Sequence, residues 1–75
     1  DTLKTRNNLA LAYLSVGRFA EAIDAWEELL PDCQRVLGAD HPDTLKTRNN
    51  LALAYLSVGR LAEAIDEWEK LLPDC

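Results

Sequence analysis

Carboxylates are the side chains that could most readily carry chemistry in this chain, because only one histidine accompanies its thirteen acidic residues. Glu27 and Glu28 are adjacent, and Asp24 lies one helical turn before Glu28. Paired carboxylates can act as general acid and base. The apolar residues near them follow helical spacing on the other face, so nothing apolar surrounds the pair to raise a pKa. We therefore expect a solvated acidic face and no enzyme activity.

Metal, thiol and cofactor chemistry have no better support. His41 has no second histidine or cysteine at ligand spacing. Cys33 and Cys75 occupy the same position of two sequence copies, so we expect them to lie one repeat apart, beyond disulfide reach. Cys33 fits a small buried apolar side chain. Without a glycine-rich phosphate loop or a nucleophile–histidine set, we predict no metal, no cofactor and no small-molecule substrate.

The charge pattern limits the possible partners. The formal net charge of −5 argues against nucleic acid. Residues 1–18 hold three basic side chains and one acidic, whereas residues 19–33 hold five acidic side chains. No apolar run approaches the roughly 18 residues needed to span a bilayer, so we expect no membrane partner. Asp1 is not a native start and no leader begins the chain, so we expect a fragment or a processed piece, whose start gives no cellular address. Our expectation for its location is the cytoplasm.

The elements that position these side chains come from one unit written twice. The sequence of residues 1–33 returns almost unchanged as residues 43–75. The copies differ at three positions: Phe19/Leu61, Ala25/Glu67 and Glu28/Lys70. Self-similarity at a fixed period of this kind indicates a repeat protein. We predict a single repeat domain over residues 1–75, with repeat 1 at 1–42 and a truncated repeat 2 at 43–75.

Each copy reads as two amphipathic helices joined by a tight turn. Apolar residues recur at helical spacing up to Val16, and a second set recurs from Phe19 onward. Gly17 separates the two sets and permits a positive-φ turn, which is short enough to force an antiparallel hairpin. We expect helices at residues 2–16, 19–37, 42–58 and 61–73, and no strands.

Two proline-containing stretches shape the second helix and the connection. Pro31 cannot donate a backbone hydrogen bond and should kink or break the second helix. The apolar spacing nevertheless continues to Leu37, which favours a bend over a stop. Residues 40–43 read as the start of the next helix, with an acidic or imidazole cap and Pro42 in the first turn.

The positions of particular residues resemble the tetratricopeptide repeat, whose pattern is W-x2-L-G-x2-Y, then A-x3-F, then P. The first copy reads Arg6-x2-Leu9-Ala10-x2-Tyr13, then Ala22-x3-Trp26, then Gln34. The second copy reads Arg48, Leu51-Ala52, Tyr55, Ala64 and Trp68. The resemblance implies an all-α fold, a two-repeat tetratricopeptide-like solenoid of helical hairpins that is a fragment of a right-handed superhelix. These leucines, alanines, tyrosines and tryptophans would then pack the repeats.

The chain departs from the family pattern at defined places. Arg6 and Arg48 stand where the family has a large aromatic, and Gln34 replaces the last proline. The period, which runs from Asp1 to Asp43, is longer than is usual for the family. The added residues 35–42 and the sequence at 7–10 resemble the long-period variant of kinesin light chains and of bacterial arrays attached to signalling NTPases.

Small and aromatic residues have separate packing roles. Ala10 and Ala22 are small enough to let the two helices of a hairpin approach closely. We expect Tyr13 and Trp26 to fill the space between hairpins, with their polar tips bonded to water or to a carbonyl.

In tetratricopeptide relatives, the first helices of the hairpins line a groove that holds extended peptides. Amide side chains there can bond a peptide backbone, and lysines favour an acidic peptide or a terminal carboxylate. The matching groove residues here are Lys4, Asn7, Asn8, Leu11, Leu14, Lys46, Asn49, Asn50, Leu53 and Leu56, with Ser15 and Ser57 beside them.

Two functions remain, and both act through protein contact. The first is a structural scaffold module, a consensus-like, designed or recently amplified repeat. Its uncapped ends would associate with further copies end to end, or by domain swapping at Pro31 or at residues 38–42. The alternative is a peptide-binding module of a larger bacterial signalling protein, with an extended peptide in the groove. We expect the first.

Overall fold

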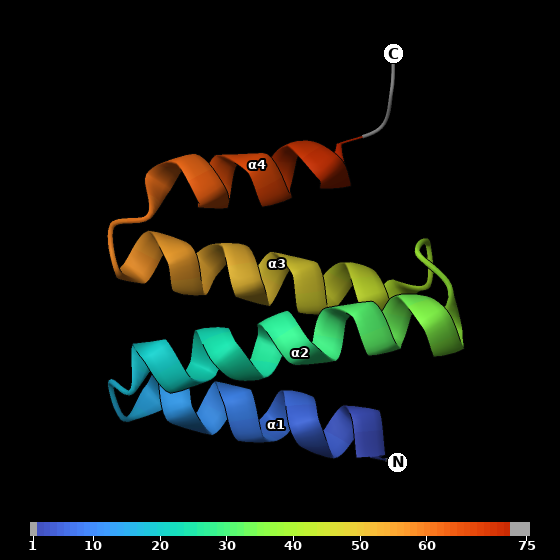
Figure 1. Ribbon diagram of the computed structural model, residues 1–75, viewed down its shortest axis with the longest axis horizontal. Coiled ribbons are helices and arrows are strands. Elements are labelled where there is room, and N and C mark those ends of the chain that lie inside the picture. The colour runs from blue at the N-terminus through green and yellow to red at the C-terminus, as the bar shows by residue number, and fades with distance from the viewer. Residues whose placement is uncertain (1, 73–75) are drawn as a thin grey trace.

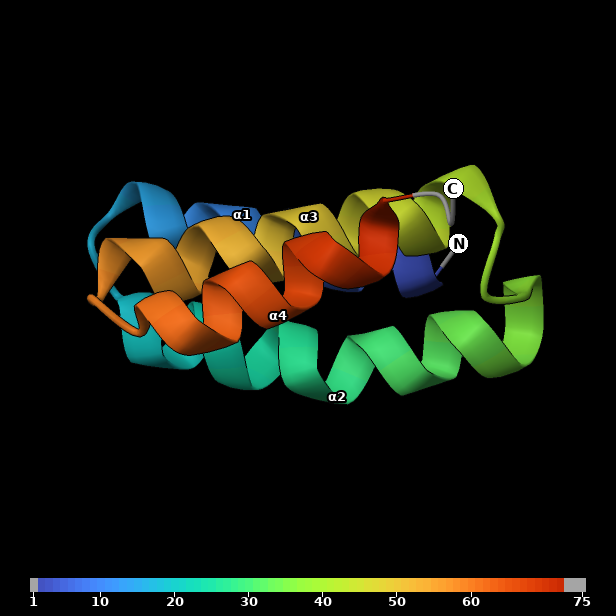
Figure 2. The same ribbon diagram turned by 90° about the horizontal axis from the view of Figure 1, so that it is seen from above.

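Two antiparallel helical hairpins lie side by side in the computed structural model, which describes residues 2–72 (Figure 1). The helices are α1 (Thr2–Ser15), α2 (Phe19–Leu37), α3 (Pro42–Ser57) and α4 (Leu61–Leu71), and this part of the chain contains no strand. Each helix packs against the next along the chain. Figure 2 shows α1 and α3 on one face of the molecule and α2 on the other. The predicted all-α hairpin architecture is confirmed.

The turns inside the hairpins depend on glycine. Gly17 has a φ of 83° and Gly59 a φ of 79°, a region that side chains with a Cβ rarely adopt. The backbone N–H of Arg18 donates to the carbonyl of Tyr13 at 2.8 Å, and Arg60 repeats this bond to Tyr55 at 2.9 Å. These bonds satisfy carbonyls at the end of the first helix and turn the chain back on itself.

Helix α2 does not break at Pro31. It continues to Leu37 and ends at Gly38, and Figure 2 shows it curving along its length. The next helix begins with His41 as its cap, whose Nδ1 accepts a hydrogen bond from the N–H of Asp43 at 3.1 Å. The imidazole therefore provides the predicted cap, and α3 starts one residue before the repeat boundary drawn from the sequence.

The ends of three helices differ slightly from the sequence prediction. Helices α1 and α3 each stop one residue early, at Ser15 and Ser57. Helix α4 ends at Leu71, and Leu72 is extended. The last predicted residue of this helix, at position 73, lies outside the described residues.

One core runs through both hairpins. Ala10 and Ala22 are fully buried where α1 and α2 approach each other, as predicted for small side chains. Trp26 and Leu29 fill the centre of the core and are completely covered. The core continues into the second hairpin through Ile23, Leu30, Cys33, Leu51, Ala54, Tyr55 and Ala64.

Candidate functional site

The near-identity of the repeats lets each position be compared in two environments. Leu51 is 2% exposed because α2 packs against its face of α3, whereas Leu9 at the same position of α1 is 51% exposed. The prediction that Leu9 packs between repeats is therefore wrong for this copy, since no helix of the described chain covers that face. Tyr13 is half-buried for the same reason, while Tyr55 is buried.

Helix α4 shows the matching effect at the other end of the stack. Ile23 is 4% exposed between the hairpins, and its counterpart Ile65 is 54% exposed. Leu72 is likewise exposed where Leu30 is buried, and Trp68 is only half-buried. We call the α1 side the leading face and define it by Thr2, Thr5, Leu9, Ala12 and Tyr13. We call the α4 side the trailing face and define it by Ile65, Trp68, Glu69 and Leu72.

Side-chain hydrogen bonds cross the junction between repeats. The hydroxyl of Tyr55 donates to Oε2 of Glu27 at 2.6 Å. Burial and then this bond raise the pKa of Tyr55, so the phenol stays protonated and remains a donor. Nδ2 of Asn50 donates to Oδ1 of Asn7 at 3.3 Å. Neither contact was predicted from the sequence, because residue type and spacing do not reveal which side chains face each other across a junction.

The tryptophans bond to asparagines of their own hairpin. Nε1 of Trp26 donates to Oδ1 of Asn7 at 2.8 Å, and Nε1 of Trp68 donates to Oδ1 of Asn49 at 2.9 Å. The carbonyl partner expected for Trp26 is therefore the side-chain amide carbonyl of an asparagine, and Trp68 repeats this bond. Asn7 and Asn49, both predicted groove residues, already use their acceptor oxygens inside the protein.

A cavity of about 230 Å³ opens where α1, α2 and α3 meet. It brings together four predicted groove residues, Lys4, Asn7, Asn8 and Lys46. Residues that the groove prediction did not include complete the lining: Leu3, Cys33, Leu37, Asp43 and Thr47.

The remaining predicted groove residues lie elsewhere. Leu11 and Leu14 pack against the core, and Leu53 and Leu56 are exposed on α3. Asn49 and Asn50 make the hydrogen bonds already described, and Ser15 and Ser57 each donate to a carbonyl one turn earlier in their own helix.

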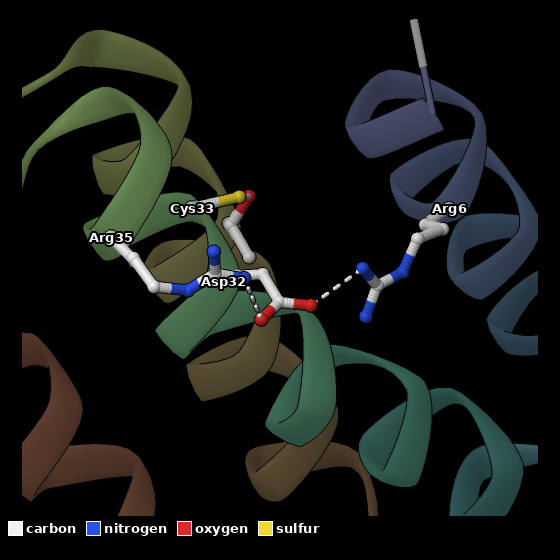
Figure 3. A network of polar contacts seen from close by, with 5 residues as sticks. Arg6, Asp32, Cys33 and Arg35 are labelled. Carbon is white, nitrogen blue, oxygen red and sulfur yellow. Dashed lines mark hydrogen bonds and ion pairs between the residues drawn. The ribbon is translucent and has the colours of Figure 1, made fainter.

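Asp32 on α2 contacts two arginines, Arg6 on α1 and Arg35 on its own helix (Figure 3). Nη1 of Arg6 lies 2.7 Å from one carboxylate oxygen, and Nη2 of Arg35 lies 2.9 Å from the other. Hydrogen bonds from Arg6 and then from Arg35 lower the pKa of Asp32 below its usual value of 3.8. In the second repeat Arg48 pairs instead with Glu67 at 2.9 Å, which is possible because a glutamate replaces alanine there.

The Asp32 pair predicts a pH dependence. Because the folded-state pKa of Asp32 is depressed, its contribution to stability is present above the unfolded-state pKa and disappears as the pH falls through the folded-state value. Asp32→Asn should therefore unfold at lower urea than the parent at about pH 7, and the difference should shrink by about pH 3. Asp24→Asn, on the same helix, is the control. An Asp32→Asn deficit that persists undiminished in acid would contradict this origin.

Thr44 predicts a stabilising substitution. Its side chain is fully buried, and its Oγ1 has no hydrogen-bond partner within residues 2–72. Thr44→Val removes a buried polar atom at constant shape and should raise the free energy of unfolding by about 1 kcal/mol. The exposed counterpart, Thr2→Val, should change it little. Urea denaturation followed by circular dichroism measures both, and a destabilised Thr44→Val would show that this hydroxyl is satisfied in solution.

Residues 2–72 contain neither a metal-binding cluster nor a membrane-spanning helix. No three histidine, cysteine or acidic side chains gather there in a way that could hold a metal ion. None of the helices in that range combines the length and the apolar character needed to cross a membrane.

Comparison with known proteins agrees with the hairpin geometry. The family model described as tetratricopeptide repeat matches residues 1–73, nearly the whole chain. Repeats of this family generally serve as scaffolds for protein–protein contact and are not catalytic. No solved structure matches the chain significantly. The family match shows that this chain belongs to the tetratricopeptide repeat family, in agreement with its paired helices, glycine turns and buried small residues.

Proposed function

We propose that this chain is a scaffold module that associates with copies of itself end to end, through the leading and trailing faces. One observation carries the proposal. The residue types buried between the two repeats stand exposed at the two ends, as Leu9 and Ile65 show. Burying such side chains is favourable, and a repeat hairpin needs a neighbour to do so.

Sedimentation velocity tests the proposal. The weight-average mass of the sedimenting species should rise as the protein concentration increases from about 10 µM to 1 mM. Dissociation constants in this range are expected of a small, partly apolar interface. A single species of monomer mass over that range would overturn the proposal. Domain swapping through the connection at residues 38–41 is a second route to self-association, which would form only after unfolding and refolding at high concentration.

We further propose that the chain belongs to the long-period class of these repeats and acts in the cytoplasm. The recurrence of Asp1 as Asp43 and the cap at His41 support the first part, because the residues added to the usual period complete α2 and start α3.

The cavity between α1, α2 and α3 supports a second candidate function, which is binding of an extended peptide. Lys4 and Lys46 supply two positive charges to its lining against one negative charge from Asp43. Such a lining favours an acidic peptide or a free terminal carboxylate. Fluorescence anisotropy with an acidic peptide should show binding that weakens in Lys4→Ala and Lys46→Ala. Equal binding of the parent and these variants would exclude the cavity as the site.

A further inference from the structure

The hydrogen bonds between the two repeats have counterparts at the open ends. Tyr55 donates to Glu27 and Asn50 donates to Asn7 across the internal junction. One repeat earlier, the two donor positions are Tyr13 and Asn8 on α1. One repeat later, the two acceptor positions are Glu69 and Asn49 on the second hairpin. All four carry the same residue types as the internal pair of contacts.

This inference rests on the proposed end-to-end association. We infer that these four residues form two specific hydrogen bonds between neighbouring chains. Tyr13 of one copy donates to Glu69 of the next, and Asn8 of that first copy donates to Asn49 of the next. The partner is therefore a second copy of this chain, joined leading face to trailing face in one register.

Two of these four residues, Tyr13 and Asn49, already make the same contacts within their own hairpins as their counterparts at the internal junction. The guanidinium of Arg18 lies 4.9 Å from the centre of the Tyr13 ring, as Arg60 lies 4.6 Å from that of Tyr55. Asn49 accepts from Trp68 as Asn7 accepts from Trp26. The Tyr13 ring and the Asn49 amide therefore need little further ordering on association, which favours binding.

The differences between the repeats leave these contacts intact. Glu67, which replaces alanine, pairs with Arg48 inside its own hairpin. Lys70, which replaces glutamate, lies 3.3 Å from Asp66 and 3.6 Å from Glu67 on its own helix. None of the three side chains that change takes part in a hydrogen bond between repeats.

The same chemistry disfavours the two symmetric ways of joining copies. Two trailing faces would bring the carboxylates of two Glu69 side chains together without a donor, and like charges repel. Two leading faces would bring two Tyr13 donors together without a carboxylate. Only the leading-to-trailing contact gives the hydroxyl of Tyr13 a carboxylate acceptor and gives the carboxylate of Glu69 a donor, so the joint is directional and does not close on itself.

Substituting one residue of each face with arginine tests the direction of the contact between chains. Ala12 is exposed, but its counterpart Ala54 is fully buried between the repeats, so Ala12→Arg blocks the leading face. Ile65→Arg blocks the trailing face by the same comparison with Ile23. Each variant alone should sediment as a monomer, whereas an equimolar mixture should form a heterodimer and nothing larger. Self-association of either variant alone would overturn the directional joint, and it would identify a symmetric contact or a domain swap.

Conservative variants test the hydrogen bond between Tyr13 and Glu69 of neighbouring chains. Glu69→Gln and Tyr13→Phe should each weaken association of the chain about tenfold, and the double variant should weaken it no further, because both remove the same hydrogen bond. Asp66→Asn, a carboxylate of α4 outside the junction, is the control and should associate like the parent. If the parent does not associate at all, the proposed function fails. If the parent associates and Glu69→Gln associates equally strongly, the inferred hydrogen bond is wrong and the proposed end-to-end association stands.

Discussion

Replacing Trp26 with alanine should cost about 3–5 kcal/mol of unfolding free energy, the largest loss expected from a single substitution in this chain. The side chain is fully buried at the centre of the core, between both hairpins. Truncation would leave a cavity. It would also remove the indole N–H that donates to Oδ1 of Asn7 at 2.8 Å. In a domain this small, such a loss approaches the whole stability. Urea denaturation followed by circular dichroism measures it.

Trp68→Ala is the matched control, because Trp68 occupies the same position of the second repeat and makes the same bond to an asparagine, although Glu67 replaces alanine just before it. Its ring is only half-buried at the trailing face, so its removal should cost about 1–2 kcal/mol. The comparison must be made at a concentration where the parent is monomeric. Equal losses in the two variants would show that sequence context, and not position in the stack, sets the contribution of this residue.

Replacing Arg48 with alanine should also be strongly destabilising, with a loss of about 2 kcal/mol of unfolding free energy. The side chains of Arg48 and Glu67 are 11% and 13% exposed, so removing the arginine leaves a mostly buried carboxylate without its main partner. Lys70, 3.6 Å from the other oxygen of Glu67, should limit the loss. Thermal and urea unfolding at low and high salt would measure it, and a nearly buried pair should depend little on salt.

Arg6→Ala provides the control at the equivalent position. Arg6 and Asp32 are 39% and 33% exposed, and a pair so accessible to water contributes little to stability, so Arg6→Ala should lose much less than Arg48→Ala. Arg35 also remains bonded to Asp32 in this variant. A loss from Arg6→Ala as large as that from Arg48→Ala would mean that the aliphatic part of the arginine, and not its charge pairing, stabilises both sites.

Much of the fold could be predicted because its determinants are local or repeated. The spacing of apolar residues defined four helices to within one or two residues over the described chain, and glycines marked both hairpin turns. The sequence did not decide whether Pro31 kinks or breaks α2, because the cost of one lost hydrogen bond competes with packing along the whole helix. The core contacts of Leu29 and Cys33 on both sides of the proline maintain the helix.

The candidate surfaces were predictable only in part. Lys4 and Lys46, which the resemblance assigned to a peptide groove, both line the cavity between α1, α2 and α3. It did not show that Asn7 and Asn49 accept hydrogen bonds from tryptophans, since helix spacing does not reveal which side chains meet across a hairpin. The ion pairs were missed for the same reason.

The sequence alone determined the repeat period, the helical hairpin and the identity of the residues able to pack it. Only the tertiary structure decided which copy of each residue is buried. Leu9 and Leu51 have the same sequence neighbours, as do Ile23 and Ile65, yet one of each pair is covered and the other is open to solvent. Burial depends on whether another hairpin lies against the face in question, and this is a property of position in the stack that no residue encodes by itself.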